Sequence, residues 1–383
     1  MVDTLKTYSD VASACIHCEK CTDSCINLSE VNTDLGKFAL MMHDAFSQGS
    51  KEENQDLTQV LRSCFLCGYC VNECPSDIDV ISLMLAGRQD YQKAGFIPRA
   101  AWVSVQVDQE WDIFKAYRAI YGIGYTDLYK HEDGDCELAF FPGCSLAAYA
   151  PELTREIFAK IEELGGKTTL VDYCCGSPLK SAGFIDRADA LCERFVSEIK
   201  QSGAKKVLCC CPGCYNILVK ALEKYECSAQ ACMLPNFLEE AGFNCENAEV
   251  KSPRFFVSCQ DHGANASDGI KHIMGLPQDA PQICGGCCGA GGAVSAFKPE
   301  RQAAKVEEIF AQCVPGDTLV TMCPTCTYTF AFQQISAGKG AGIDNKNYLE
   351  LIFSNKFDWE ENFKRLNEMW VGPYGSWLAQ VFS

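Results

Sequence analysis

Five cysteines in a fixed order occur twice along this chain, and this repeat constrains the fold more than any other feature. The first set is Cys144, Cys174, Cys175, Cys211 and Cys214, and the second is Cys259, Cys287, Cys288, Cys323 and Cys326. Corresponding cysteines lie 115, 113 and 112 residues apart at the first, third and last positions of the sets. A nearly constant offset over three markers indicates that one domain has been duplicated.

Short apolar segments alternate with longer helical patterns around both sets. In the first repeat we expect strands within residues 137–141, 167–171 and 205–210, and helices within 151–166, 187–203 and 215–225. In the second repeat we expect strands within 254–258, 280–284 and 317–322, and helices within 299–313 and 328–336. Such alternation is typical of a parallel sheet with helical crossovers, so the sequence predicts two duplicated Rossmann-like α/β domains.

All three elements of each cysteine set directly follow expected strands, at the sheet edge where α/β proteins place their ligands. Cys211 and Cys323 each begin a Cys-Pro-x-Cys segment that opens a helix, where backbone N–H groups favour a thiolate. Gly176 and Gly289 follow the adjacent cysteines, and we expect them to let the backbone pass close to a bulky cofactor. Five thiols are one more than a tetrahedral zinc ion or an ordinary cubane cluster takes.

Two further groups of four cysteines lie near the N-terminus with the same spacing, C-x2-C-x2-C-x3-C. The first group is Cys15, Cys18, Cys21 and Cys25, and the second is Cys64, Cys67, Cys70 and Cys74. This is the bacterial ferredoxin spacing for two [4Fe–4S] clusters, in which the fourth cysteine of each run ligates the other cluster. The crossing rule assigns one cluster to Cys15, Cys18, Cys21 and Cys74, and the other to Cys64, Cys67, Cys70 and Cys25.

Zinc is the alternative metal for these two runs, because zinc sites also use four cysteines. Zinc modules usually pair two C-x2-C halves across a longer spacer, so the two identical runs favour iron–sulfur clusters. Ile26 stands where a proline commonly follows the fourth cysteine, a departure that removes no ligand. His17 lies inside the first run, and we expect it to tune the cluster by hydrogen bonding rather than to ligate iron.

The remaining segments complete the expected organisation. A helix is predicted within residues 33–49, capped by Asn32, Thr33 or Asp34. Residues 96–135 are aromatic-rich and are expected to form a helical connector that packs the first domain on the rest, with a partner-docking surface as the alternative. The expected division is a helical ferredoxin-type domain (1–95), the connector (96–135), two α/β domains (136–250 and 251–354), and a tail docked on the body or on another subunit (355–383).

Composition narrows the class of protein. The chain has 27 cysteines, no signal-peptide pattern and no apolar run of membrane-spanning length. We therefore expect a cytoplasmic protein without a direct membrane span, whose clustered thiols bind metal rather than form disulfides. The net charge of −17, without a block of Lys and Arg, argues against nucleic-acid binding.

The CCG domains, named for the adjacent cysteines and their glycine, stand in tandem behind a two-cluster ferredoxin domain. This arrangement resembles the catalytic subunit of heterodisulfide reductase over roughly residues 10–335. The resemblance implies that each five-cysteine set holds a noncubane [4Fe–4S] cluster, in addition to the two cubane [4Fe–4S] clusters. It also implies that a disulfide is cleaved between the noncubane clusters in two one-electron steps, with electrons supplied by the ferredoxin clusters.

The expected protein is thus a fused heterodisulfide-reductase-like oxidoreductase subunit that needs no side-chain nucleophile. Its donor would be another protein, either a flavoprotein, a hydrogenase, a ferredoxin or a membrane cytochrome. The same domain pair occurs in iron–sulfur subunits of dehydrogenases, respiratory complexes and aromatic-degradation complexes, so a non-catalytic electron conduit is the alternative. A zinc scaffold without redox activity is the third hypothesis. Both five-cysteine sets are intact, which favours chemistry, whereas spacers that are short for the reductase leave the disulfide substrate open.

Several residues keep more than one interpretation. His262 is a candidate proton donor to a leaving thiolate, with a structural role as the alternative. The neighbouring cysteines of "CCCPGC" and "ICGGCC" leave the ligand register open, and Cys211 and Cys287 are chosen because they preserve the repeat. The other cysteines are expected to be mostly small buried side chains; they are Cys136, Cys192, Cys209, Cys210, Cys227, Cys232, Cys245, Cys284 and Cys313.

Overall fold

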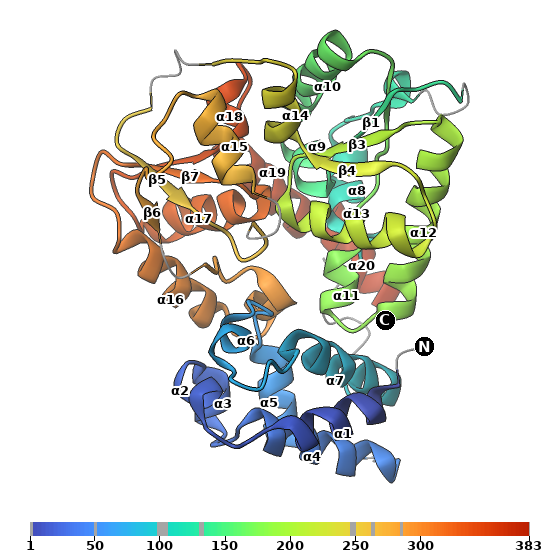
Figure 1. The fold of residues 1–383 in the computed structure, drawn as a ribbon, viewed down its shortest axis with the longest axis vertical. Coiled ribbons are helices and arrows are strands. Elements are labelled where there is room, and N and C mark those ends of the chain that lie inside the picture. Colours follow the sequence, from blue (N-terminus) through green and yellow to red (C-terminus); the bar gives the residue numbers. More distant parts are fainter. Residues whose placement is uncertain are drawn as a thin grey trace. The chain divides into compact units, whose positions relative to one another are not determined.

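A computed structural model of the chain describes residues 3–49, 52–97, 106–129, 134–245, 250–261, 265–283 and 286–382. Its contacts divide the chain into two compact units. The helical unit contains residues 1–106 together with 178–187 and 289–302, and the sheet unit contains 107–177, 188–288 and 303–383. Figure 1 labels their elements along the chain. None of the described helices is long and apolar enough to cross a membrane.

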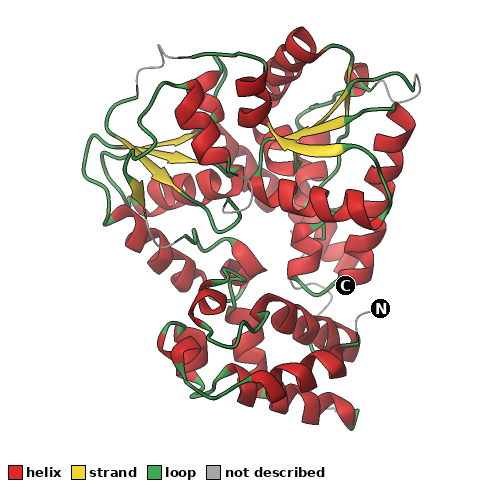
Figure 2. Cartoon of the chain, in the orientation of Figure 1, coloured by secondary structure: helices red, strands yellow, loops and turns green. Residues whose placement is uncertain are grey.

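The N-terminal part of the helical unit consists of helices and loops in its described residues, as Figure 2 shows. The helices are α1 (Thr4–Ala14), α2 (Lys20–Asp23), α3 (Ile26–Glu30), α4 (Leu35–Ser47), α5 (Gln55–Ser63), α6 (Tyr69–Glu73) and α7 (Val80–Ala94). The predicted helix within 33–49 is confirmed as α4, and its cap is Asp34, whose side chain accepts the Lys37 N–H. Phe38, Leu61 and Leu83 lie in the buried core of this unit.

Two segments that follow the adjacent cysteines belong to the helical unit, and we call them the first arm (178–187) and the second arm (289–302). The first arm carries most of helix α11 (Ser177–Ser181), and the second carries the 3-10 helix η4 (Gly291–Ala296). The second arm lies directly on the backbone of a cysteine run: a Cβ atom on Gly292 would lie 2.1 Å from the carbonyl oxygen of Cys64. Each CCG repeat therefore contributes a segment to the unit that contains the ferredoxin-type cysteines.

The sheet unit contains two four-stranded parallel sheets with the same topology. The first has the order β2-β1-β3-β4, and the second has the order β6-β5-β7-β8. Their strands are β1 (Leu138–Phe141), β2 (Thr168–Leu170), β3 (Lys206–Cys209), β4 (Gln230–Met233), β5 (Pro253–Phe256), β6 (Gln282–Ile283), β7 (Thr318–Thr321) and β8 (Asp344–Asn347). The predicted fold class, a helical part followed by two parallel-sheet domains, is confirmed.

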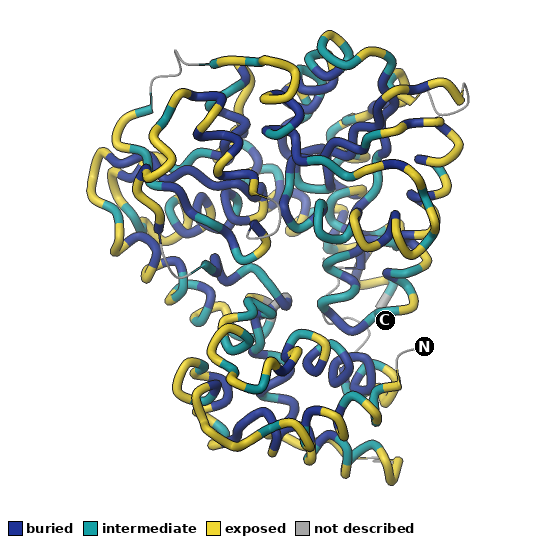
Figure 3. Tube along the Cα trace, viewed as in Figure 1, coloured by how far each residue is buried: buried dark blue, intermediate teal, exposed yellow. Residues whose placement is uncertain are grey.

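Helices cover these sheets, because strands β1, β2 and β7 are buried along their whole length and need apolar partners on both faces. The helices are α9 (Cys144–Tyr149), α10 (Pro151–Gly165), α12 (Ile185–Ser202), α13 (Pro212–Lys224), α14 (Leu234–Glu240), α15 (Ala266–Ile273), α16 (Pro299–Phe310), α17 (Pro324–Ala337) and α18 (Leu349–Ile352). Figure 3 shows the strands as largely buried segments and the outer helix surfaces as exposed.

Strands β4 and β8 were not predicted. Both are short, and β8 reads Asp-Asn-Lys-Asn, so neither has the apolar alternation that marks a strand. Each pairs with an inner strand that the sequence does predict, β3 or β7. Pairing with a neighbour, rather than side-chain pattern, therefore makes them strands.

The described part of the connector and the tail pack on the sheet unit. Helix α8 (Ile113–Ile120) precedes the short 3-10 helix η2 (Thr126–Leu128), and the tail forms α19 (Trp359–Val371) and α20 (Pro373–Phe382). The Tyr117 hydroxyl of α8 donates to Asn362 Oδ1 at 2.6 Å, and Asn362 in turn donates to the Tyr149 carbonyl at 2.9 Å. Tyr149 is in α9, so these bonds tie the connector and tail to the first repeat.

Candidate metal centres

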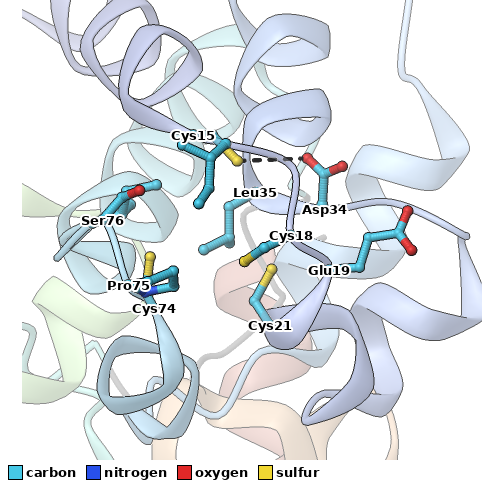
Figure 4. A pocket seen from close by; sticks show the side chains of 11 residues that line it. Cys15, Cys18, Glu19, Cys21, Asp34, Leu35, Cys74, Pro75 and Ser76 are labelled. Atoms are coloured by element: carbon cyan, nitrogen blue, oxygen red, sulfur yellow. Dashed lines mark hydrogen bonds between the residues drawn. The ribbon is translucent and has the colours of Figure 1, made fainter.

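The first ferredoxin-type run lies around a depression of about 300 Å³, a volume that includes space open to solvent. Figure 4 shows Cys15, Cys18, Cys21 and Cys74 around it, with Cys15 beside Asp34. Three of these cysteines come from the loop between α1 and α2 and from α2 itself, and Cys74 comes from the end of α6. The geometry therefore gathers the four thiols that the crossing rule groups together.

A carboxylate and a glycine shape this pocket. Asp34 is buried, and its Oδ1 lies 3.9 Å from Cys15 Sγ and 3.1 Å from His17 Nδ1. Burial raises the pKa of Asp34, but hydrogen bonds from the Lys37 N–H and from His17 outweigh burial and hold the pKa below its usual value. A Cβ atom on Gly36, in the first turn of α4, would lie 2.9 Å from Cys15 Sγ, so the helix approaches the thiol closely only because this residue is glycine.

The second run is grouped with Cys25. Burial raises the pKa of Cys70, and the nearby charges of Cys64, Cys25 and Cys67 raise it further. Such mutual repulsion requires the four sulfur atoms to lie close together, which is the arrangement that a metal cluster neutralises. The eight thiols thus fall into two groups of four, each completed by a cysteine from the other run. A donor set of four thiols in each group fits a [4Fe–4S] cubane.

The first five-cysteine set is assembled at the carboxyl ends of β1, β2 and β3. Cys174 Sγ lies 3.7 Å from Cys144 Sγ, and further thiol–thiol hydrogen bonds join Cys174 to Cys175, Cys175 to Cys214, and Cys214 to Cys211. The pKa of Cys175 is well below its ordinary value because its sulfur accepts from Cys174 and Cys214. All five thiols of the set are therefore connected.

The order β2-β1-β3 places the crevice between β1 and β3, where the chain changes direction across the sheet. Cys144 begins α9 after β1, and Cys211 caps α13 after β3, so they flank this crevice. A Cβ atom on Gly143 would lie 3.2 Å from Cys214 Sγ, and this glycine has a positive φ of 78°. The backbone before α9 thus leaves room for a group larger than a single thiol.

The second set occupies the equivalent ends of β5, β6 and β7. Hydrogen bonds between thiols join Cys288 to Cys326 and Cys326 to Cys323, while Cys259 lies after β5 and Cys287 after β6. Cys323 Sγ lies 3.6 Å from Cys211 Sγ of the first set. The two sets therefore meet at one place in the sheet unit, where the N-termini of α13 and α17 also meet.

The pair Cys211 and Cys323 holds its protons unevenly. The pKa of Cys323 is well below the ordinary value because its sulfur accepts from Cys211, and then from Cys326. Cys214 donates to Cys211 and lowers its pKa, but the Cys323 sulfur and burial outweigh this bond, so the pKa of Cys211 is well above the ordinary value. The expected preference of helix N-termini for thiolate thus holds for Cys323, and its partner keeps the proton.

The open register of "CCCPGC" can be examined from these positions. The Cys209 thiol donates to the Cys232 carbonyl at 3.5 Å and lies 3.7 Å from Met233 Sδ, away from the set. The Cys210 carbonyl accepts the Tyr348 hydroxyl at 3.1 Å. Cys211 is the residue of this run that lies with the other thiols of its set. Outside the sets, Cys136, Cys192, Cys209 and Cys210 are buried, whereas Cys227, Cys232, Cys245 and Cys313 are half-buried. Cys284 lies outside the described residues.

The two glycines expected beside the cofactor have a visible packing role. Gly176 has a φ of 82°, and its Cβ position lies 3.4 Å from the Ala188 carbonyl oxygen of α12. Gly289 has a φ of 78°, and its Cβ position lies 3.0 Å from the Gln302 Cα of α16. Both glycines therefore turn the chain against a helix in the same way, and their closeness to a cofactor stays a prediction. His262 lies outside the described residues.

Sequence reasoning missed residues that stand beside the thiols. Gly36 and Gly143 had no visible signal, because an isolated glycine in a helix or turn has many uses. Asp34 was considered only as a helix cap. Arg88, which is fully buried and donates to the Cys64 carbonyl at 2.6 Å, reads in the sequence as an ordinary charged residue of a helix.

Comparisons with known proteins agree with this architecture. A family model described as "4Fe-4S dicluster domain" matches residues 14–79, and one described as "Cysteine-rich domain" matches residues 138–219 and 254–331. An iron–sulfur relative from Methanothermobacter marburgensis, one of the subunits of fumarate reductase (CoM/CoB), is 24% identical over 358 residues, covering 88% of this chain and 71% of the relative.

Heterodisulfide reductases are also among the relatives. One of the subunits of dihydromethanophenazine:CoB–CoM heterodisulfide reductase from Methanosarcina barkeri is 25% identical over 304 residues, and its counterpart from Methanosarcina mazei is 23% identical over 309 residues. These alignments cover 72% of this chain in both cases, and 74% and 73% of the relatives. The chain therefore belongs to the heterodisulfide-reductase-related family of iron–sulfur subunits, in which a 4Fe-4S dicluster domain precedes two cysteine-rich domains.

Proposed function

We propose that this chain is an oxidoreductase subunit that carries electrons through two cubane [4Fe–4S] clusters to two noncubane [4Fe–4S] clusters, where a disulfide is reduced. The 3.6 Å approach of Cys211 and Cys323 is the observation that carries the proposal, because it brings the two five-cysteine sets to one place. A conduit that only relays electrons has no need for two complete sets at a single point. The names of the relatives, which include heterodisulfide reductase subunits, support the same reaction class.

The proposed ligands are those that the geometry groups. The cubane ligands are Cys15, Cys18, Cys21 and Cys74 for the first cluster and Cys64, Cys67, Cys70 and Cys25 for the second. The noncubane ligands are Cys144, Cys174, Cys175, Cys211 and Cys214 for one cluster and Cys259, Cys287, Cys288, Cys323 and Cys326 for the other. An electron-donating subunit is the expected partner, since the chain has no convincing dinucleotide-binding glycine motif of its own.

Reduction of a disulfide consumes two electrons and two protons and releases two thiols. When bound, the clusters supply the electrons one at a time and offer iron to the sulfur atoms of the cleaved disulfide. The chain contributes the position: Cys211 and Cys323 stand at the N-termini of α13 and α17, whose dipoles stabilise negative charge on sulfur. Burial of the surrounding cysteines excludes water and strengthens this electrostatic effect.

Anaerobically loaded protein tests the proposal directly. Iron and acid-labile sulfide are measured first, and oxidation of reduced viologen is then followed with a panel of disulfides. We expect turnover with at least one disulfide and its loss in Cys323→Ser. Cys313→Ser is the matched control, because this half-buried thiol donates to the Ile309 carbonyl outside both sets. Fully loaded protein that reduces no disulfide would identify an electron conduit, and zinc without iron or sulfide would refute both.

A further inference from the structure

Arg88 of helix α7 is a buried cation at the centre of the helical unit. Its side chain is fully buried, and its guanidinium donates to the carbonyl oxygens of Leu61 at 2.9 and 2.6 Å and of Cys64 at 2.6 Å. The same guanidinium donates to the Ser181 carbonyl of the first arm. A Cβ atom on Gly292 of the second arm would lie 3.1 Å from its terminal nitrogens. Helices α5 and α7 and both arms therefore meet at this one charge.

The Arg88 charge acts on the second ferredoxin-type group. Burial raises the pKa of Cys64 to about 11, and the positive charge of Arg88 opposes that rise, so the guanidinium and the Cys64 sulfur interact electrostatically. Cys64 is a proposed ligand of the cluster completed by Cys67, Cys70 and Cys25. Because both partners are buried, solvent screens this interaction weakly.

The first ferredoxin-type group has the opposite neighbour. Asp34, a buried carboxylate, lies 3.9 Å from Cys15 Sγ. Lys37 and His17 contact the same carboxylate and offset part of its charge, but both side chains are substantially exposed and screened. The two groups of four cysteines, alike in spacing, thus differ in the sign of the nearest buried charge.

We propose that Arg88 raises the reduction potential of the Cys64, Cys67, Cys70 and Cys25 cluster above that of the cluster held by Cys15, Cys18, Cys21 and Cys74. One-electron reduction adds a negative charge to a cluster, and a buried cation stabilises that charge while a carboxylate opposes it. Electrons therefore move from the first cluster to the second. The second cluster is also the one whose cysteine run lies under the second arm, three residues beyond Cys288 of the CCG set.

The inference rests on the proposed cluster ligands, so loading is measured separately from potential. Wild-type protein, Arg88→Gln, Arg88→Lys and the control Lys93→Gln are loaded anaerobically and assayed for iron and sulfide. Lys93 lies on the same helix as Arg88 and carries the same charge, but it is exposed. The two cubanes are titrated by redox potentiometry with EPR detection, and their signals are assigned by their loss in Cys18→Ser and Cys67→Ser.

The expected results distinguish charge from packing. Arg88→Gln lowers the equilibrium constant for reducing the second cluster at least tenfold, which is about 59 mV for a one-electron couple. Arg88→Lys retains the charge and most of the potential, and Lys93→Gln changes neither cluster. The first cluster in the same molecule serves as the internal reference.

Two outcomes would overturn the inference. One is an Arg88→Gln protein with full iron content and an unchanged second-cluster potential, which would leave the proposed function intact. The other needs no variant: a wild-type first cluster with a potential equal to or above that of the second. Wild-type protein that binds no iron–sulfur cluster would refute the proposed function itself, so the two failures are distinguishable.

Discussion

Replacing Gly36 by alanine tests whether the first cysteine group depends on the close approach of α4. The new Cβ atom would lie 2.7 Å from Cys15 Cβ, 2.8 Å from His17 Cε1 and 2.9 Å from Cys15 Sγ. Real carbon atoms do not approach this closely, so Cys15 or the start of α4 must move. Gly36 has ordinary helical backbone angles, and alanine therefore brings a compensating gain in helix propensity.

The two effects can be compared. Alanine stabilises a helix interior by about 1 kcal/mol relative to glycine, and overpacking a close contact costs roughly 1–3 kcal/mol. The net destabilisation is therefore modest, at about 0–2 kcal/mol. The displacement of Cys15 matters more, because a [4Fe–4S] cluster needs all four of its thiolates in place. We expect Gly36→Ala to fold and to lose the first cubane while it keeps the second.

Iron, acid-labile sulfide and the EPR signals of both cubanes check this expectation. Gly87→Ala is the matched control: it also places a Cβ atom 2.8 Å from a neighbour in a helix interior, but that neighbour is Leu61 Cδ2, the end of a flexible side chain. The control should retain both clusters. Gly36→Ala protein with full iron content and an unaltered first-cluster signal would show that the reasoning about Cys15 is wrong.

Three further predictions concern the sheet unit. Cys174→Ser, or Cys287→Ser in the other set, should remove one noncubane cluster and leave both cubanes, as measured by iron content and EPR; loss of a cubane signal would contradict the separation of the sites. Asp317→Asn should destabilise the second repeat because Asp317 accepts from Ser252 Oγ at 2.5 Å and from the Val314 N–H at 2.9 Å. The hydrogen bond from Ser252 is the main cause that lowers the pKa of Asp317, so its contribution is fully present above the unfolded value of about 3.9; the penalty in chemical denaturation should be equal at pH 6 and pH 8, and a change between them would refute this sign. Trp359→Ala should cost about 3–5 kcal/mol, because the buried ring stacks on Phe357 at 4.8 Å; proteolysis of the tail should accelerate, and an equally resistant tail would contradict its docking.

The fold was predictable where side-chain patterns are strong. The buried strands β1, β3, β5 and β7 and the helices that follow them have clear apolar patterns, and the repeated cysteines align the two domains without any structure. The strands β4 and β8 were not predictable, because they depend on pairing with β3 and β7. The arms were not predictable either: nothing in residues 178–187 or 289–302 distinguishes a loop of the sheet unit from a part of the helical unit.

The candidate site divides in the same way. Ligand types and spacing are written in the sequence, so the grouping of Cys74 with the first run and of Cys25 with the second could be anticipated from the crossing rule. The approach of Cys211 to Cys323 could not, because it depends on how the two repeats pack. The charges beside the thiols also could not: Asp34 and Arg88 are ordinary helix residues in the sequence, and only burial makes their charges important.

Duplication has a consequence beyond the doubling of a cluster site. Gly176 and Gly289 turn the chain in the same left-handed way after each Cys–Cys pair, and each turn leads into an arm. The first arm accepts a hydrogen bond from Arg88, and the second places Gly292 against the same guanidinium. Each repeat thus contributes both a cysteine set and a piece of the wall around one buried charge. A single repeat would leave part of that wall absent and expose the Arg88 charge to water, where screening would weaken its effect on Cys64.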